Sequence, residues 1–108
     1  DGGTSNPTGF ETAVELISSL PATRKILLTA GIVDLGRKSA EIHQNLARSA
    51  GRLVSEVWYF GEIGKSEFVN ELGQRVIHQR DQIEQRIKQL TKDDLLLVEG
   101  RMPKWLTL

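Results

Sequence analysis

Residues 26–60, ILLTAGIVDLGRKSAEIHQNLARSAGRLVSEVWYF, decide the fold class of this chain. The segment begins and ends in short apolar runs, Ile26–Leu28 and Val57–Phe60, in which apolar and polar residues do not alternate. Such runs are typical of strands that are buried on both faces of a parallel sheet. Between them, apolar residues recur every three or four positions and predict a helix over residues 38–53. These residues are Ile42, Leu46, Ala50 and Leu53.

Further apolar runs extend this pattern along the chain. Leu95–Val98 and the shorter pair Val76–Ile77 are the remaining strand candidates. Helical spacing precedes the first strand and recurs around residues 68–72 and 83–90. The order α, β, α, β, α, β, α, β predicts one doubly wound α/β sandwich, a Rossmann-like, mostly parallel sheet with helices on both faces. The first helical stripe consists of Phe10, Ala13, Val14, Ile17 and Leu20.

Three residues predict where helices begin and end. Thr8 and Glu11 have the spacing of a capping box, so we expect the first helix to begin at Thr8. Pro21 marks the expected end of this helix. Asp81 is the expected N-cap of the last helix, because a carboxylate can accept hydrogen bonds from the first free N–H groups.

The composition excludes several classes of protein. The chain has 108 residues, which is the length of one domain, and 14 basic residues balance 14 acidic ones. A formal charge of zero argues against a nucleic-acid partner, and the absence of cysteine excludes disulfides and thiolate zinc sites. No apolar run approaches the roughly 20 residues that a membrane span needs. Because the chain begins at Asp1 without an initiator methionine, we expect a domain of a longer protein.

Glycine follows three of the strand candidates, at Gly31, Gly61 and Gly100. The carboxyl ends of parallel strands meet at one edge of the sheet, where ligands bind in open α/β folds. Glycine at this edge lets the backbone turn sharply and approach a ligand closely. We therefore expect a ligand site there, and a plain turn is the alternative for each glycine.

The common catalytic motifs are missing from the chain. The sequence contains no Walker phosphate loop, no dinucleotide-binding fingerprint and no nucleophile elbow. Residues 61–66 end in Gly-Lys-Ser, but only two residues separate the two glycines, so the loop is too short to wrap a phosphate. His43 and His78 have no metal-like spacing, and we expect each to be a packing or surface histidine.

Four blocks of sequence occur in the order and spacing of a known family. They are residues 1–7 (DGGTSNP), residues 29–36 (TAGIVDLG) with Ser39 and His43 beyond them, Phe60-Gly61-Glu62, and residues 94–101 (DLLLVEGR). Over almost its whole length the chain resembles the C-terminal domain of the Mur ligases. Within that family it is most similar to the branch that adds D-alanyl-D-alanine to a UDP-N-acetylmuramoyl-tripeptide.

The resemblance implies ATP-dependent amide formation during peptidoglycan synthesis in the bacterial cytoplasm. A substrate carboxylate is phosphorylated by ATP, and an incoming amine attacks the acyl phosphate. ATP and Mg²⁺ are the implied cofactors, with the phosphate loop and the magnesium ligands in a central ATPase domain and the UDP-sugar site in an N-terminal domain. Residues 1–108 would then form the C-terminal domain, with residues 1–7 as the interdomain linker. By itself this domain would hold no catalytic residue and no metal and would be inactive.

The resemblance also implies roles for individual residues. Asp1 matches the linker aspartate that holds the ribose of ATP, and Asn6 lies beside the nucleotide. The implied pocket for the incoming amino acid or dipeptide consists of Ser5, Gly31, Gly61, Glu62, Gly100 and Arg101. Arg101 could pair bidentately with the carboxylate of that substrate, and a solvated loop arginine is the alternative.

Three differences from the family pattern leave the amine substrate open, and the first is Gly3-Thr4, which stands where the entry loop of the family has Tyr and Asn. Glu99-Gly100-Arg101 stands where the family has Lys-Gly-Ser, and Gly31 stands where aspartate is common. One alternative is the C-terminal domain of another ATP-dependent amino-acid ligase, of the cyanophycin or folylpolyglutamate type. The other alternative is an α/β binding module without catalysis. A phosphate loop encoded upstream of Asp1 would favour a ligase over the module.

Overall fold

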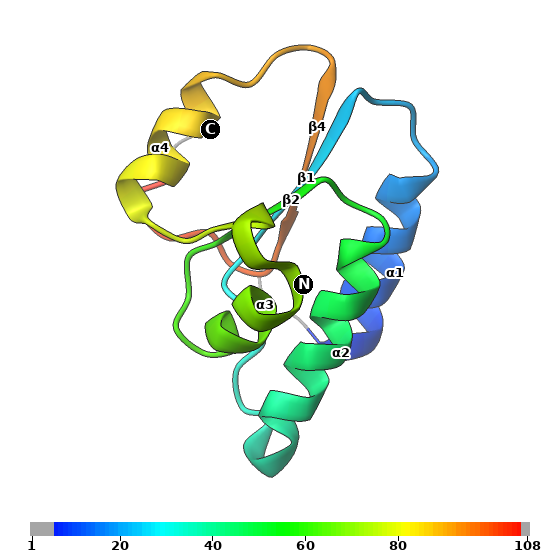
Figure 1. The fold of residues 1–108 in the computed structure, drawn as a ribbon, viewed down its shortest axis with the longest axis vertical. Helices are drawn as coiled ribbons and strands as arrows, with labels where there is room; N and C mark the ends of the chain where they lie inside the picture. Colours follow the sequence, from blue (N-terminus) through cyan, green and yellow to red (C-terminus); the bar gives the residue numbers. More distant parts are fainter. Residues whose placement is uncertain (1–5, 107–108) are drawn as a thin grey trace.

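The computed structural model describes residues 6–106 and consists of a four-stranded sheet with helices on both faces (Figure 1). The strand order is β3-β2-β1-β4, and all neighbouring strands run parallel. In chain order the elements are α1 (Pro7–Ser18), β1 (Arg24–Thr29), the 3₁₀ turn η1 (Gly36–Lys38), α2 (Ser39–Gly51), β2 (Glu56–Tyr59), α3 (Lys65–Leu72), the 3₁₀ turn η2 (Gly73–Arg75), β3 (Val76–Ile77), α4 (Arg80–Lys88) and β4 (Asp94–Glu99). No helix in this part of the chain is long and apolar enough to cross a membrane.

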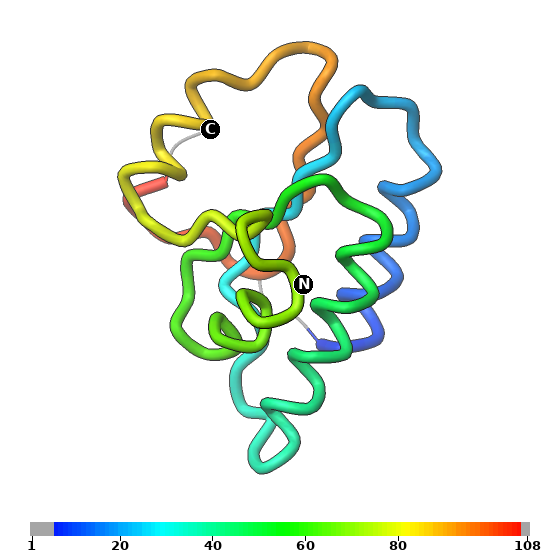
Figure 2. The backbone as a smooth tube through the Cα atoms, in the orientation of Figure 1, coloured from blue at the N-terminus to red at the C-terminus, as the bar shows by residue number. Residues whose placement is uncertain are grey.

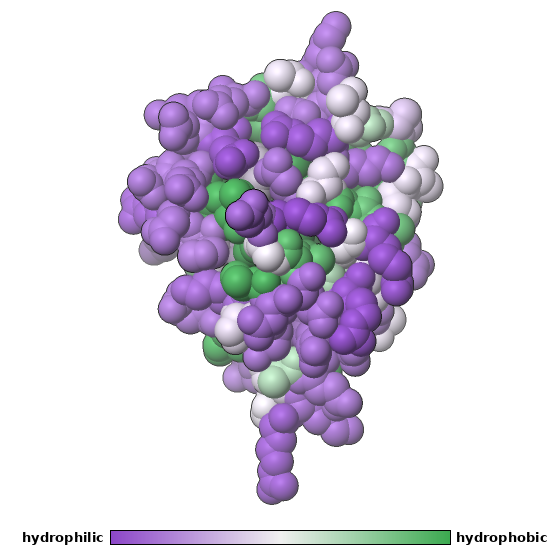
Figure 3. Space-filling model, in the orientation of Figure 1, coloured by the Kyte–Doolittle hydropathy of each residue, from purple (hydrophilic) through white to green (hydrophobic). Residues whose placement is uncertain are grey.

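Helices α1, α2 and α3 cover one face of the sheet, and α4 covers the other (Figure 1). Successive side chains of a strand point to opposite faces, so the strands supply both cores. Leu27 packs with the three-helix layer, whereas Ile26 and Leu28 pack with α4. This arrangement explains the unbroken apolar runs, and it confirms the predicted doubly wound sandwich. The view in Figure 3 is mainly hydrophilic, with apolar side chains gathered near its middle, around α3.

The strand β4 is less buried than the sequence predicts. Side chains of Leu95–Val98 pack against both cores, as the sequence predicts, but every residue of β4 is only half-buried. Among the described residues, β4 pairs with β1 alone and forms an edge of the sheet. The strand was therefore predicted at the right place, and its depth was wrong because hydrophobicity does not report the position of a strand within the sheet.

Two helix starts also differ from prediction. Helix α1 begins at Pro7 and not at Thr8, because Asn6 is the N-cap and its side chain accepts a hydrogen bond of 2.8 Å from the Gly9 N–H. Proline suits the first helical position because its missing N–H would lack a partner there anyway. The helix ends at Ser18, which leaves Leu20 outside the apolar stripe and 44% exposed.

Helix α4 also begins earlier than predicted. Its N-cap is Gln79, and Asp81 lies inside the first turn, where the prediction of Asp81 as the N-cap was wrong. A carboxylate in the first turn still stabilises the helix, since it faces the positive end of the helix dipole.

An arginine joins three strands at the amino edge of the sheet. The Arg24 guanidinium lies 3.1 Å from the Asp94 carboxylate of β4 and 3.4 Å from the Glu56 carboxylate of β2. The hydrogen bond from Arg24 lowers the pKa of Asp94. Charge pairs thus occupy the edge opposite the glycine-marked loops.

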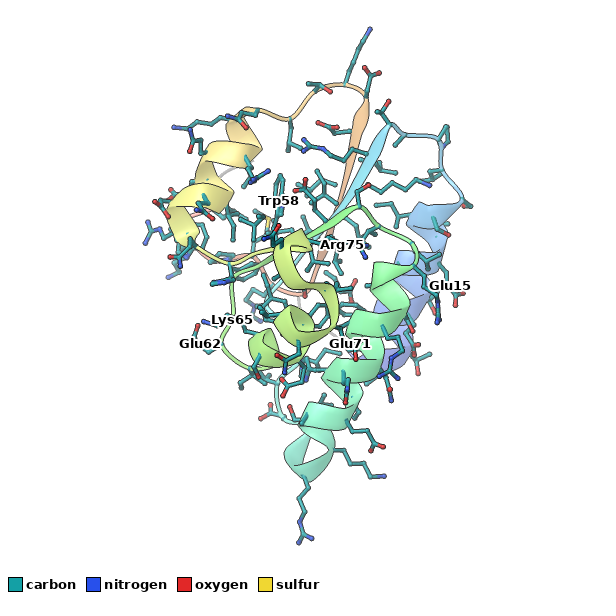
Figure 4. The ribbon with its side chains drawn as sticks, in the orientation of Figure 1. Glu15, Trp58, Glu62, Lys65, Glu71 and Arg75 are labelled. Atoms are coloured by element: carbon teal, nitrogen blue, oxygen red, sulfur yellow. The ribbon has the colours of Figure 1, made fainter. Side chains whose placement is uncertain are left out.

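A second arginine closes the end of α2. Arg75 donates hydrogen bonds of 2.6 Å to the carbonyls of Gly51 and Val54, and one of 3.2 Å to that of Ser55 (Figure 4). Carbonyls at the end of a helix have no partner within the helix, and its dipole is negative there. Arg75 therefore ties η2 to the end of α2.

Candidate functional site

The strand order identifies the edge of the sheet at which a ligand would bind. The chain moves from β1 outward to β2 and β3, and then crosses back to place β4 on the other side of β1. Helix α4, which makes this crossing, lies on the opposite face from α2 and α3. In open α/β sheets, ligands bind outside the carboxyl ends of the strands at such a reversal. Here that point lies beyond Thr29 of β1 and Glu99 of β4.

Thr29 connects the two strands at this point. Its side chain is fully buried and donates a hydrogen bond of 3.0 Å to the Glu99 carbonyl. The same hydroxyl accepts a hydrogen bond of 3.1 Å from the Gly31 N–H. The Thr29 hydroxyl therefore links Gly31 to the residue that precedes Gly100.

The loop after β2 lies against the same junction. The Phe60 N–H donates a hydrogen bond of 3.1 Å to the Thr29 carbonyl. A side chain at Gly61 would collide with the carbonyl oxygen of Ala30, so the two loop backbones are in direct contact there. The structure thus brings Gly31, Gly61 and Gly100 to one edge.

His43, on α2, contacts the loop after β1 at this edge. Its side chain is 0% exposed, and its Nε2 accepts a hydrogen bond of 3.0 Å from the Ile32 N–H. Since Nε2 is the acceptor, Nδ1 carries the proton and donates to the Ser39 carbonyl at 2.8 Å. Both ring nitrogens are satisfied by the backbone, which confirms the expectation of a packing histidine.

Tyr59 connects the loop after β1 with the loop after β2. Its hydroxyl donates a short hydrogen bond to the Ile63 carbonyl, and burial raises the pKa of that hydroxyl. Gly31 and Gly64 both have positive φ angles, of 84° and 85°. A Cβ at either position would collide with the Tyr59 hydroxyl and crowd the His43 ring. Only glycine fits both positions without displacing these side chains.

Two charged candidates on this edge are exposed. The Glu62 carboxylate lies 2.9 Å from the ammonium of Lys65, the first residue of α3, and the two side chains lie side by side (Figure 4). The hydrogen bond from Lys65 lowers the pKa of Glu62. Arg101 directly follows Gly100 and is exposed. Both residues are accessible to a ligand.

The N-terminus of α1 lies at the same edge. Helix α1 runs to residues 19–23, which turn beside residues 89–93 at the amino end of the sheet (Figure 2). The side-chain oxygen of Asn6 is engaged as the N-cap of this helix. Asp1 and Ser5 lie outside the described residues. The nucleotide role of Asn6 stays a prediction.

The described residues contain no cluster of potential metal ligands. Between residues 6 and 106, no group of three or more His, Asp or Glu side chains could hold a metal. No residue of this part of the chain is therefore assigned as a metal ligand.

One hollow of about 320 Å³ lies away from the carboxyl edge, between α1 and α2, with Glu11, Glu15 and Arg52 in its wall.

The fold is similar to that of a known ligase structure, the crystal structure of MurF ligase from Thermotoga maritima in complex with ADP. The TM-score is 0.74 and the sequence identity 21%, over 93% of this chain and 23% of that one. The likeness shows a shared fold, and the chain spans about a quarter of the length of that protein. No protein-family model matches the sequence, and no curated protein matches it significantly.

Sequence reasoning missed part of this edge. No role at this edge was predicted for Thr29, Tyr59 or Gly64, which hold the loops together. A local signal exists for His43, because Ser39 lies four residues before it and the two side chains therefore lie on one side of a helix. The partners of Tyr59 and Gly64 come from other loops, and no local pattern shows them.

Proposed function

We propose that this chain is the C-terminal domain of a Mur-type ATP-dependent amide ligase, and that its carboxyl edge binds the incoming amine. The observation that carries the proposal is the strand reversal between β1 and β4, with Gly31, Gly61 and Gly100 on that one edge. Two further observations support it: the four ordered sequence blocks, and the fold shared with a MurF ligase that was crystallised with ADP.

In the proposed reaction, the γ-phosphoryl group of ATP is transferred to a substrate carboxylate, which yields an acyl phosphate and ADP. The amine nitrogen then attacks the acyl carbon, the amide forms, and inorganic phosphate leaves while the nitrogen loses a proton. We assign the phosphate loop and the magnesium ligands to a central ATPase domain, and the UDP-sugar site to an N-terminal domain. This domain closes over the nucleotide, excludes water and positions the amine.

The roles within the domain follow from its edge. Asp1 and Asn6 would contact the nucleotide, and Ser5 the incoming substrate. Arg101 would pair with the carboxylate of an incoming amino acid or dipeptide, because a guanidinium can donate two parallel hydrogen bonds to a carboxylate. The remaining substrate contacts would come from Gly31, Gly61, Glu62 and Gly100. Such an enzyme would act in the bacterial cytoplasm and serve cell-wall synthesis, cell shape and cell division.

The test is a screen of amine substrates with the full-length protein, following phosphate release from ATP in the presence of a UDP-muramoyl peptide. Release should require an amine, and the isolated 108-residue chain should release no phosphate above a blank without protein. Arg101→Ala should raise the KM for the amine and leave the KM for ATP nearly unchanged. Arg52→Ala is the matched control, since Arg52 is an exposed arginine at the far end of α2.

Two outcomes would contradict the proposal. If no amine stimulates phosphate release, the chain does not belong to this ligase reaction. Binding of an amine without any turnover in the full-length protein would favour the non-catalytic binding module. Equal kinetics for Arg101→Ala and Arg52→Ala would remove the assigned role of Arg101.

A further inference from the structure

The loops after β1 and β2 are held together by buried side chains that the proposed reaction does not use directly. His43 fixes the backbone of Ile32, and Tyr59 fixes that of Ile63. Gly31 and Gly64 fit against both side chains with no room for a Cβ. The four residues are therefore one packed junction, to which both loops are tied.

The bonds of His43 distinguish this junction from ordinary core packing. A buried polar ring destabilises the fold unless both nitrogens are hydrogen-bonded, and an aliphatic side chain would fill the same space without this cost. Here both bonds go to the backbone, and one of them reaches from α2 to the loop. The Ile32 N–H is buried and has its acceptor in His43. The histidine therefore sets the position of the loop as well as filling the core.

The outer parts of the same loops are exposed. Val33 is 60% exposed, although it directly follows Ile32, whose N–H is bonded to His43. Ile63 is 48% exposed, although its own carbonyl accepts the hydrogen bond from Tyr59. The two loops thus have a fixed base and accessible apolar side chains at the edge where the strand order reverses. A binding surface that is rigid before the ligand arrives loses less entropy on binding.

We propose that His43 and Tyr59 are positioning residues for the amine substrate. They hold the loop of residues 31–36 and the loop of residues 61–64 as one preorganised wall of the site, without touching the substrate themselves. The inference rests on the function proposed above. Loss of either side chain should loosen the wall, and a misplacement of the order of 1 Å can cost about a hundredfold in rate.

The experiment compares three variants of the full-length protein: His43→Leu, His43→Gln and Tyr59→Phe. His43→Leu and Tyr59→Phe should raise the KM for the amine by about tenfold or more, with the KM for ATP unchanged. His43→Gln should keep the KM for the amine close to the wild-type value, because the glutamine amide oxygen can accept the hydrogen bond from the Ile32 N–H. Hydrogen exchange of the Ile32 amide, measured in parallel, should be slow in wild type and His43→Gln and fast in His43→Leu.

A pair of glycine variants is the matched control for strain. Gly64→Ala and Gly73→Ala both put alanine at a positive φ, but a Cβ at Gly73 meets no atom within 4 Å. Only Gly64→Ala should raise the KM for the amine and speed exchange at Ile32. If His43→Leu does not fold, Tyr59→Phe and this pair decide the question.

The two proposals can fail separately. If the wild type releases no phosphate with any amine, the proposed function fails, and exchange at Ile32 still tests the junction. An active enzyme in which His43→Leu and Tyr59→Phe keep the wild-type KM for the amine would overturn the positioning role. Equal exchange at Ile32 in wild type and His43→Leu would overturn it as well.

Discussion

Gly31→Ala is the substitution that most severely tests the packing at the carboxyl edge. Gly31 has a φ of 84°, and a Cβ built there collides with the Tyr59 hydroxyl. The same Cβ would lie 2.8 Å from the Ile63 carbonyl oxygen and 3.0 Å from the His43 Nε2. Gly36 is the matched control, since it has a φ of 63° and nothing within 4 Å of a Cβ.

The expected loss of stability has two parts. An alanine in the left-handed region costs about 1–2 kcal/mol, and this cost applies at both positions. Overpacking at Gly31 adds about 1–3 kcal/mol, because one neighbour is a backbone carbonyl that cannot rotate away. We therefore expect Gly31→Ala to lower the free energy of unfolding by about 2–5 kcal/mol, and Gly36→Ala by about 1–2 kcal/mol.

The assay is equilibrium urea unfolding followed by tryptophan fluorescence, since Trp58 is fully buried in the fold. Combining Gly31→Ala with Tyr59→Phe should recover part of the loss, because the phenylalanine removes the hydroxyl that the new Cβ meets. Free energies of unfolding for Gly31→Ala and Gly36→Ala that agree within about 0.5 kcal/mol would refute the packing argument.

Three further predictions concern single side chains. Arg75→Ala should lower the free energy of unfolding by about 1–3 kcal/mol in the same urea assay, because three carbonyls near the end of α2 lose a charged donor. The hydrogen bond from Arg24 lowers the pKa of Asp94, so its stabilisation is complete above the ordinary pKa of about 4 and is lost as the pH falls below it. Urea titrations at a series of pH values should therefore show that the free energy of unfolding falls less from neutral to acidic pH in Asp94→Asn than in wild type. Burial raises the pKa of Tyr59, so in the folded chain this tyrosine should still be protonated at pH ~10, where a free tyrosine is half-ionised.

Each of these has an outcome that contradicts it. Wild-type stability in Arg75→Ala would mean that water replaces the three bonds at no cost. An unchanged acid slope in Asp94→Asn would show that other carboxylates carry the pH dependence. Because Tyr59 is the single tyrosine of the chain, its ultraviolet absorbance reports the residue alone, and ionisation at pH ~10 in the folded state would argue against its burial.

The sequence predicted the architecture because the architecture depends on local patterns. Short apolar runs and helical stripes alternate along the chain, and this alternation alone implies parallel strands with crossover helices. Helix starts were less predictable, because Asn6 and Thr8 are both good caps and the choice depends on Pro7 between them. The depth of β4 depends on which strands neighbour it, and the sequence of the strand contains no such information.

The candidate site was predictable only in outline. Glycines after three strands were enough to predict one shared edge, and the structure places Gly31, Gly61 and Gly100 there. The junction of Tyr59 with Gly64 depends on contacts between two loops, and spacing along the chain cannot reveal such contacts. The roles of the individual residues in binding remain predictions.

The most direct test of the ligand-binding edge is an amide chemical-shift map of the protein, titrated with the amine that supports phosphate release. The amides of Gly31, Gly61, Gly100 and Arg101 should shift together and saturate at one concentration of amine, while those around Arg24 at the opposite edge stay fixed. Shifts confined to the amino edge, or to the hollow between α1 and α2, would contradict the account.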